Sequence, residues 1–166
     1  MTAITTPRDL FVHELGDILY VEQKLTQEVL PGLIAEVRRD DLRKGLERHL
    51  EQTRGHVTNL EQAFDAVGEQ PKAEKCIGFE GLKNEHDELA SEVSGDLVDL
   101  VDAGAAARTE HYEIAAYSGL IEMARALGES EVVSLLEENL KEEREALREV
   151  ESVTKTLRDD VKATSR

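Results

Sequence analysis

The chain has 166 residues, the size of one ordinary domain, and its 36 acidic and 20 basic residues give a formal net charge of −16. This balance argues against binding to nucleic acid or to an anionic membrane, because both need clustered Lys and Arg. No segment reaches the roughly 18 apolar residues of a membrane span, and we expect no signal peptide. A single cysteine, Cys76, excludes an internal disulfide and a cysteine-based zinc site. We therefore expect one cytoplasmic domain over residues 1–166, with its core at about 7–158.

The first predicted helix begins at a clear start signal. Thr6 suits the N-cap, Pro7 suits the first helical position, and Asp9 can answer the cap. Apolar residues then recur at intervals of three, four or seven residues, which is typical of an amphipathic helix. They are Phe11, Leu15, Ile18, Leu25, Val29 and Leu33. Pro31 falls inside this pattern, so we expect a kink there rather than an end.

A second helix is predicted to begin at Asp40 and to stop at Gly68, where glycine suits the residue after the C-cap. Its apolar face consists of Leu46, Leu50, Val57, Leu60 and Phe64. The first two helices therefore form an antiparallel hairpin. Residues 69–95 contain Pro71 and several glycines with weak periodicity, so we expect a long crossover that contains one short helix.

Two further helices are predicted at about 96–127 and from Ser130 to about Arg158. Gly128 separates them, and Ser130 is the expected cap of the last helix. The inner face of the third helix is rich in alanine and contains Tyr117. The inner face of the fourth consists of Val132, Leu136, Leu140, Leu147, Val150 and Leu157. The sequence thus predicts an all-α, antiparallel four-helix bundle.

Four glutamates break the apolar stripes. Since an α-helix turns about 100° per residue, the position of each polar residue relative to its stripe can be computed. Glu22 lies at the centre of the first stripe, Glu110 at the centre of the third with Glu113 one turn on, and Glu143 at the centre of the fourth. Any one of them alone could lie at a stripe edge and reach water, so only the set is informative.

The second helix offers no central carboxylate. Glu51 points away from the apolar face, whereas His49, Thr53 and His56 point inward and Gln52 lies on the shoulder. Each histidine alone could be a packed core residue with one hydrogen bond.

Taken together, these side chains predict a metal site. An isolated ionised carboxylate in an apolar core is very costly unless it is paired, protonated or bound to a cation. No Lys or Arg lies on these stripes to pair with the glutamates. Two divalent ions would relieve the repulsion, and carboxylate oxygen with imidazole nitrogen suits iron, manganese or zinc better than calcium.

Several stretches of the chain resemble the YciF/YciE stress-protein family of the ferritin-like di-metal carboxylate superfamily. The most specific is Glu110-His-Tyr-Glu113-Ile-Ala-Ala-Tyr117. The others are residues 11–17 with Glu22, residues 49–53 with His56, Cys76, and residues 140–143. The resemblance covers about residues 8–150. It implies a ferritin-like four-helix bundle with a long crossover, a homodimer, two metal ions and a link to stress.

The resemblance also implies ligands. Glu22, Glu110, Glu113 and Glu143 match ligand positions of the superfamily, and the Glu110-x-x-Glu113 pair is more similar to rubrerythrin than to ferritin. Gln52 or His56 would have to supply the ligand from the second helix, because Gln52 and Arg54 stand where a strict Glu-x-x-His would be. In the fourth helix, Ala146 and Leu147 stand where relatives have His and Asp. This would make the site asymmetric.

Our leading hypothesis is a non-haem di-metal protein, with iron foremost and manganese or zinc as alternatives, that acts on peroxide or O₂ in stress defence. Such a protein would be a rubrerythrin-like or ferroxidase-like oxidoreductase, with Tyr117 as hydrogen-bond or proton donor one turn from Glu113. Two other hypotheses stay open: metal sequestration or storage, and a dimeric structural stress protein with a degenerate metal site.

Overall fold

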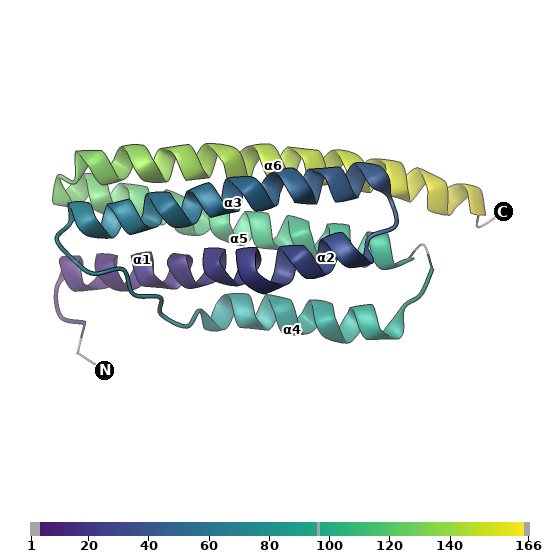
Figure 1. Ribbon diagram of the computed structural model, residues 1–166, viewed down its shortest axis with the longest axis horizontal. Coiled ribbons are helices and arrows are strands. Elements are labelled where there is room, and N and C mark those ends of the chain that lie inside the picture. Colours follow the sequence, from purple (N-terminus) through teal and green to yellow (C-terminus); the bar gives the residue numbers. More distant parts are fainter. Residues whose placement is uncertain (1–3, 96, 165–166) are drawn as a thin grey trace.

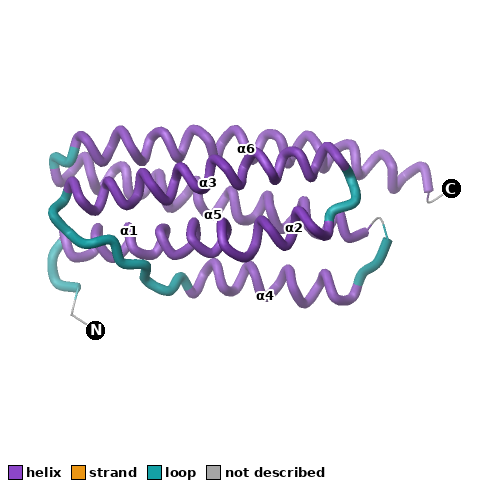
Figure 2. Tube along the Cα trace, in the orientation of Figure 1, coloured by secondary structure: helices purple, strands orange, loops and turns teal. Residues whose placement is uncertain are grey.

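The computed structural model describes residues 4–95 and 97–164, with side chains to Asp159. These residues form helices joined by loops, with no strand among them (Figures 1 and 2). The helices are α1 (Pro7–Lys24), a π-helical turn (Leu25–Val29), α2 (Leu30–Glu36), α3 (Asp40–Ala66), α4 (Ile77–Glu92), α5 (Leu97–Leu127) and α6 (Ser130–Thr164). No helix in the described part of the chain is long and apolar enough to cross a membrane.

Four long helical elements form the predicted bundle. The continuous rod of α1 and α2, together with α3, α5 and α6, runs along the long axis of the molecule (Figure 1). Helix α1 contacts α3 and α5, and α6 contacts the same two helices, so the four close into a ring. The chain colours in Figure 1 show that each pair of neighbouring helices in this ring is antiparallel. Helix α4 lies outside the ring and packs mainly on α5.

The first rod is continuous but not regular. Thr6 and Asp9 form the predicted capping box, with Pro7 in the first turn. The irregularity expected near Pro31 takes the form of a π-helical turn directly before it, where the N–H of Leu30 donates to the carbonyl of Leu25. Proline has no N–H and its ring would clash with the carbonyl four residues earlier in a regular helix, and the wider turn relieves that clash.

The predicted helix ends are mostly confirmed. Gly68 and Gly128 have φ angles of +73° and +81°, the left-handed conformation that glycine adopts without strain after a helix. Asp96, the predicted first residue of the third long helix, lies outside the described residues. The expected end of the last helix at about Arg158 is wrong, because α6 continues to Thr164.

The crossover contains a longer helix than the short one expected, since α4 has 16 residues. At its start, Sγ of Cys76 lies 2.9 Å from the hydroxyl oxygen of Tyr112 on α5. The preceding loop crosses α1 closely, because the N–H of Glu74 donates to the carbonyl of Gly16 at 2.9 Å. A Cβ on Gly16 would lie 2.6 Å from the carbonyl oxygen of Lys72. Glycine is therefore needed where the crossover passes over α1.

The core contains more polar groups than the sequence pattern indicated. Apolar residues from all four long elements fill it, with Phe11, Leu15 and Tyr117 fully buried. The buried polar residues among those described are Glu22, His49, Thr53, His56, Asp99, Asp102, Glu110, Glu113, Asn139 and Glu143. The four predicted glutamates are all present in this set. Two further carboxylates, Asp99 and Asp102, are buried as well, and the reading of the apolar stripes did not identify them.

Candidate metal centre

Six side chains that could hold metal ions meet in the middle of the bundle, and every long helical element supplies at least one. They are Glu22 from α1, His49 and His56 from α3, Glu110 and Glu113 from α5, and Glu143 from α6. None of the six residues is more than 6% exposed. The helical period alone places the glutamates here, because each lies within an apolar stripe that the bundle buries.

The six side chains form two groups that share one residue. His49, Glu110, Glu113 and Glu143 can each offer an atom within 4.8 Å of the others, and so can Glu22, His56 and Glu143. The two oxygens of Glu143 face different histidines: Oε2 lies 3.8 Å from Nε2 of His49, and Oε1 lies 2.8 Å from Nδ1 of His56. Glu143 thus stands between the two groups, as a bridging carboxylate would.

The first group has too few hydrogen-bond donors for its charge. Nε2 of His49 lies 3.2 Å from Oε1 of Glu110. Oε2 of Glu110 and both oxygens of Glu113 are buried without a hydrogen-bond partner among the described residues. Burial, reinforced by the nearby carboxylates, raises the pKa of Glu110 and of Glu113 well above the ordinary value. These oxygens are therefore suited to a cation.

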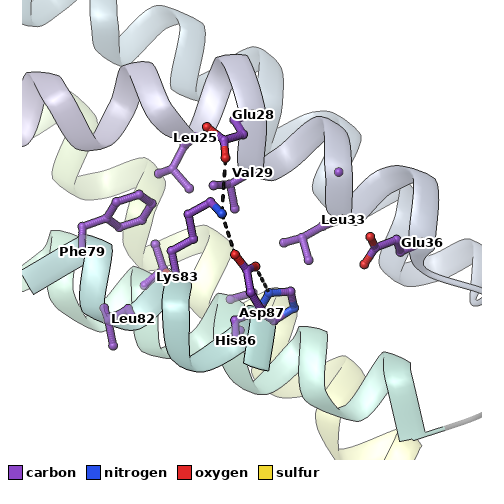
Figure 3. A pocket seen from close by; sticks show the side chains of 14 residues that line it. Leu25, Glu28, Val29, Leu33, Glu36, Phe79, Leu82, Lys83, His86 and Asp87 are labelled. Carbon is purple, nitrogen blue, oxygen red and sulfur yellow. Dashed lines mark hydrogen bonds and ion pairs between the residues drawn. The ribbon is translucent and has the colours of Figure 1, made fainter. Parts of the chain in front are cut away.

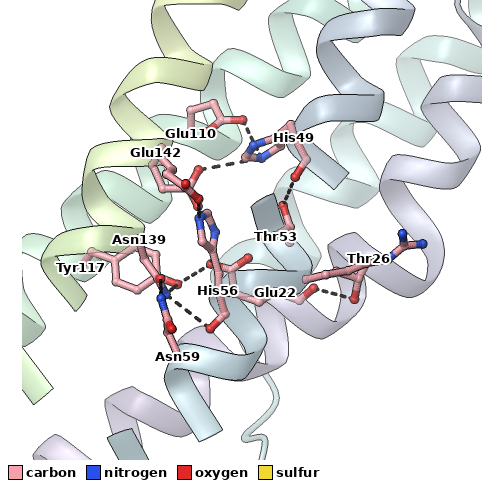
Figure 4. A network of polar contacts seen from close by, with 12 residues as sticks. Glu22, Thr26, His49, Thr53, His56, Asn59, Glu110, Tyr117, Asn139 and Glu142 are labelled. Carbon is pink, nitrogen blue, oxygen red and sulfur yellow. Dashed lines mark hydrogen bonds and ion pairs between the residues drawn. The ribbon is translucent and has the colours of Figure 1, made fainter. Parts of the chain in front are cut away.

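The second group is arranged around His56. Its Nδ1 lies 3.3 Å from Oε1 of Glu22, and its Nε2 lies 3.0 Å from Oε2 of Glu142 (Figure 4). Burial alone would lower the pKa of His56, but Glu22 and Glu143 outweigh it and raise the pKa to about 11. The metal-free protein thus keeps a proton on His56. A metal-binding histidine usually has one ring nitrogen toward the metal and the other toward an outer carboxylate. The ring of His56 has this arrangement.

Tyr117 lies beside the second group and donates its hydroxyl proton to Glu22. Nδ2 of Asn139 donates to the Tyr117 oxygen at 3.0 Å, and Nδ2 of Asn59 donates to Oδ1 of Asn139 at 2.8 Å (Figure 4). Asn59 thereby fixes the orientation of the Asn139 amide. Because Asn139 presents a donor to the Tyr117 oxygen, the only hydroxyl proton of Tyr117 is directed to Glu22.

Helix α3 contributes His56, as predicted, and also His49, which the sequence analysis did not name as a ligand. His56 joins the second group, and Glu51 is exposed, both in line with the sequence reasoning. Gln52 is half-buried beside His49, where it opposes the lowering of the His49 pKa by burial; its role as a ligand stays a prediction. His49 was recognised only as an inward polar residue. Its distance of seven residues from His56, two helical turns, was the available signal that both belong to one site.

The donor set fits transition metals, although it is uneven. Carboxylates and imidazoles together match iron, manganese or zinc, and no buried Lys or Arg among the described residues neutralises them. Helix α6 supplies Glu143 alone to the two groups, because Ala146 and Leu147 have no ligand atom. The two groups are uneven, with four side chains in one and three in the other.

Comparison with known proteins gives the family. Residues 6–162 match a family described as a domain of unknown function, DUF892. Protein YciF of Escherichia coli (strain K12) is 33% identical over 141 residues, which is 84% of each chain. The chain belongs to the YciF-like family. This confirms the part of the resemblance that concerns the YciF family.

Solved structures of three bacterial proteins have the same fold. YcfI of Rhodopseudomonas palustris, described as a candidate structural protein, is 38% identical, with a TM-score of 0.87 over 90% of this chain and 96% of its own. The E. coli stress protein YciF is 29% identical, with a TM-score of 0.87 over 93% and 98%. A protein of Xanthomonas campestris, XCC3681, shares the fold at 20% identity, with a TM-score of 0.72 over 94% and 98%.

Proposed function

We propose that this YciF-like chain is a ferritin-like di-metal carboxylate protein that holds two divalent ions, iron foremost and manganese or zinc as alternatives. The main support is Glu143, whose two oxygens face two separate groups of donors. The unpartnered oxygens of Glu113 add to it, since a buried carboxylate without a donor calls for a cation.

Each residue has a distinct role in this proposal. His49, Glu110, Glu113 and Glu143 would hold one ion, with Gln52 beside them, and Glu22, His56 and Glu143 would hold the other. Glu142 keeps the His56 ring in place through Nε2, and Asn139 directs the Tyr117 proton to Glu22. Metal binding must displace the proton of His56, so uptake weakens as the pH falls.

We further propose that the centre reduces peroxide or O₂ in stress defence, as a rubrerythrin-like or ferroxidase-like oxidoreductase. A bound redox-active pair of ions would supply the electrons for this reduction. Tyr117 is the proton donor nearest to Glu22, and both residues are fully buried. The name of the E. coli relative as a stress protein supports the context. We expect a cytoplasmic homodimer without nucleic-acid or membrane partners.

Metal analysis of protein purified without added metal tests this proposal. Wild-type protein should contain about two ions per chain, and the double variant Glu22→Ala, Glu110→Ala should contain almost none while keeping its helical circular dichroism. Iron-loaded wild type should consume peroxide faster than the double variant. If the double variant bound as much iron or manganese as wild type, the proposed centre would be wrong.

A structural role with a degenerate site is the second candidate. It is favoured by the single ligand from α6 and by the description of the R. palustris relative as a candidate structural protein. Wild type free of metal, even after incubation with Fe²⁺, Mn²⁺ and Zn²⁺, would establish it. Storage would instead need a hollow cage, and gel filtration at about twice the chain mass of 18.5 kDa would exclude that.

A further inference from the structure

A cavity of about 320 Å³ opens between α3 and α6, and His49 of the candidate metal centre is among its lining residues. Its apolar walls include Leu42 and Leu46 from α3 and Val150 and Val153 from α6. Sites for small organic ligands begin at roughly 300 Å³ and are mainly apolar, with a few convergent polar groups. The cavity has both the size and the lining of such a site.

One residue belongs both to the cavity and to the centre. His49 lines the cavity, and its Nε2 lies 3.2 Å from Oε1 of Glu110. Gln52, which also lines the cavity, lies beside His49. A molecule that entered here would reach a proposed metal ligand without displacing any core side chain. Its polar end would meet an amide and an imidazole.

Small residues create this space. Gly45 on α3 and Ala146 on α6 both line the cavity. A Cβ on Gly45 would meet only Oε2 of Glu149 at 3.8 Å and Nη2 of Arg48 at 4.0 Å, so the cavity has room for a side chain there. Arg48 and Glu149 form an ion pair of 2.6 Å between the two helices, and both are more than half exposed. Because exposed pairs of this kind are weak, the entrance can open readily.

A second hollow, between the π-helical turn, α2 and α4, lacks these features. It measures about 170 Å³, and none of the six metal-binding side chains lines it. Nζ of Lys83 lies there between Glu28 at 3.3 Å and Asp87 at 2.6 Å (Figure 3). This hollow is therefore smaller, crossed by ion pairs and separate from the centre.

We propose that the α3–α6 cavity is the substrate site of the metal centre and takes a neutral, mainly apolar organic molecule with one hydroxyl or carbonyl group at its inner end. The site is larger than peroxide or O₂ requires, and its apolar walls favour a neutral molecule over a charged one. The proposal rests on the proposed metal centre. It adds an organic substrate class to the small oxidant named above.

Two glycines on α3 provide a matched test. Gly45 lines the cavity, whereas Gly55 is exposed and a Cβ there would meet nothing within 4 Å. Gly45→Leu and Gly55→Leu both remove a glycine from a helix interior, so both should fold at least as well as wild type. The probe is 4-bromobenzyl alcohol, titrated into metal-free protein by calorimetry. Neither substitution touches a metal-binding side chain.

Wild type and Gly55→Leu should bind one probe molecule saturably, and Gly45→Leu should bind it at least about tenfold more weakly because the leucine fills the space. The proposal is wrong if wild type shows no saturable binding, or if Gly45→Leu binds equally well. Because metal-free protein is used, this result does not depend on whether the metal centre exists.

The link to the centre is tested with Co²⁺, whose visible absorption reports its coordination. Saturating probe should change the absorption of Co²⁺-loaded wild type and of Gly55→Leu, and leave that of Gly45→Leu unchanged. If the probe binds but the absorption of wild type does not respond, the cavity does not serve the centre and the substrate proposal fails. If no Co²⁺ binds at all, the proposed metal centre fails, and with it this assignment of the cavity.

Discussion

Helix α5 carries two pairs of buried acids at the same spacing, and the two pairs differ in their surroundings. Asp99 and Asp102 precede Glu110 and Glu113 by 11 residues each, which is three turns and returns to nearly the same face of the helix. All four residues are at most 3% exposed. The aspartates lie near the start of α5 and the glutamates lie at mid-bundle. Sequence spacing and burial therefore do not distinguish the pairs.

Their partners do. Oδ1 of Asp99 accepts the N–H of Arg38 at 2.8 Å, and Oδ1 of Asp102 lies 2.8 Å from Nε2 of His86 on α4. Oδ2 of Asp102 has no hydrogen bond among the described residues, but its other oxygen is engaged. Both oxygens of Glu113 lack one. The aspartates tie α5 to its neighbours, whereas one oxygen of Glu110 and both oxygens of Glu113 have no hydrogen-bond partner among the described residues.

The largest expected difference between the pairs is in their response to metal. Saturating Mn²⁺, at about 1,000 times its dissociation constant, should raise the free energy of unfolding of wild type by about 4 kcal/mol. The double substitution Glu110→Gln, Glu113→Gln should abolish this gain, because the first group loses two of its four carboxylate or imidazole ligands. Urea denaturation with and without Mn²⁺ measures it.

Asp99→Asn with Asp102→Asn is the matched control, since it makes the same chemical change three turns away. This variant should be less stable but should keep the gain from Mn²⁺. An equal loss of the gain in both double variants would mean that the effect of Mn²⁺ is not located at the glutamates.

A second expected difference concerns the free energy of unfolding in the absence of metal. Removing a charge should lower it in the aspartate pair and raise it in the glutamate pair. Asp102→Asn should lower the free energy of unfolding by about 1–3 kcal/mol, because it weakens a buried, charge-assisted bond to His86. Glu113→Gln should raise it by about 1–3 kcal/mol at pH 7, because burial raises the pKa of Glu113 and the wild type must bind a proton there or bury a charge. Both are measured by urea denaturation with EDTA present. A destabilising Glu113→Gln would show that this carboxylate has a partner inside the protein.

The same contrast explains what the sequence could predict. Helical periodicity depends on local geometry, so it located the four helices and the four central glutamates without knowledge of the packing. The partners of Asp99 and Asp102 come from the loop before α3 and from α4, and no local pattern on α5 reveals them. Helix α4 was predicted too short because it packs on the outside of the bundle, where a weakly periodic sequence suffices.

At the centre, the limits of prediction have a different cause. His49 and His56 both point inward on one helix, but which ring nitrogen faces a carboxylate depends on side-chain rotation and on the other three helices. The π-helical turn is similar: Pro31 signalled an irregularity, while its form depends on which carbonyl Leu30 reaches. The sequence thus identified the residues of the site better than their contacts.

The smallest expected effect concerns His86. Its hydrogen bond to Asp102 raises the pKa of His86 above the ordinary value, with Asp87 adding to the shift. A histidine whose folded pKa is raised contributes stability that is fully present below its unfolded pKa, about 6.5, and is lost as the pH rises through the folded pKa. The stability difference between wild type and His86→Gln should therefore shrink by about 1 kcal/mol between pH 6 and pH 9, a modest value because the ring is partly solvated.

The comparison with His86→Gln is needed because the glutamates of the centre titrate as well, and the subtraction removes their contribution. It should be made by urea denaturation in EDTA, with Asp102→Asn as the second reference. In that background most of the pH dependence should vanish, since the first cause of the raised pKa is gone. If the difference between wild type and His86→Gln were the same at both pH values, folding would not raise the pKa of His86, and Asp102 would not act as its charged partner. Asp102 would then resemble Glu113, as a buried carboxylate without a charged partner among the described residues.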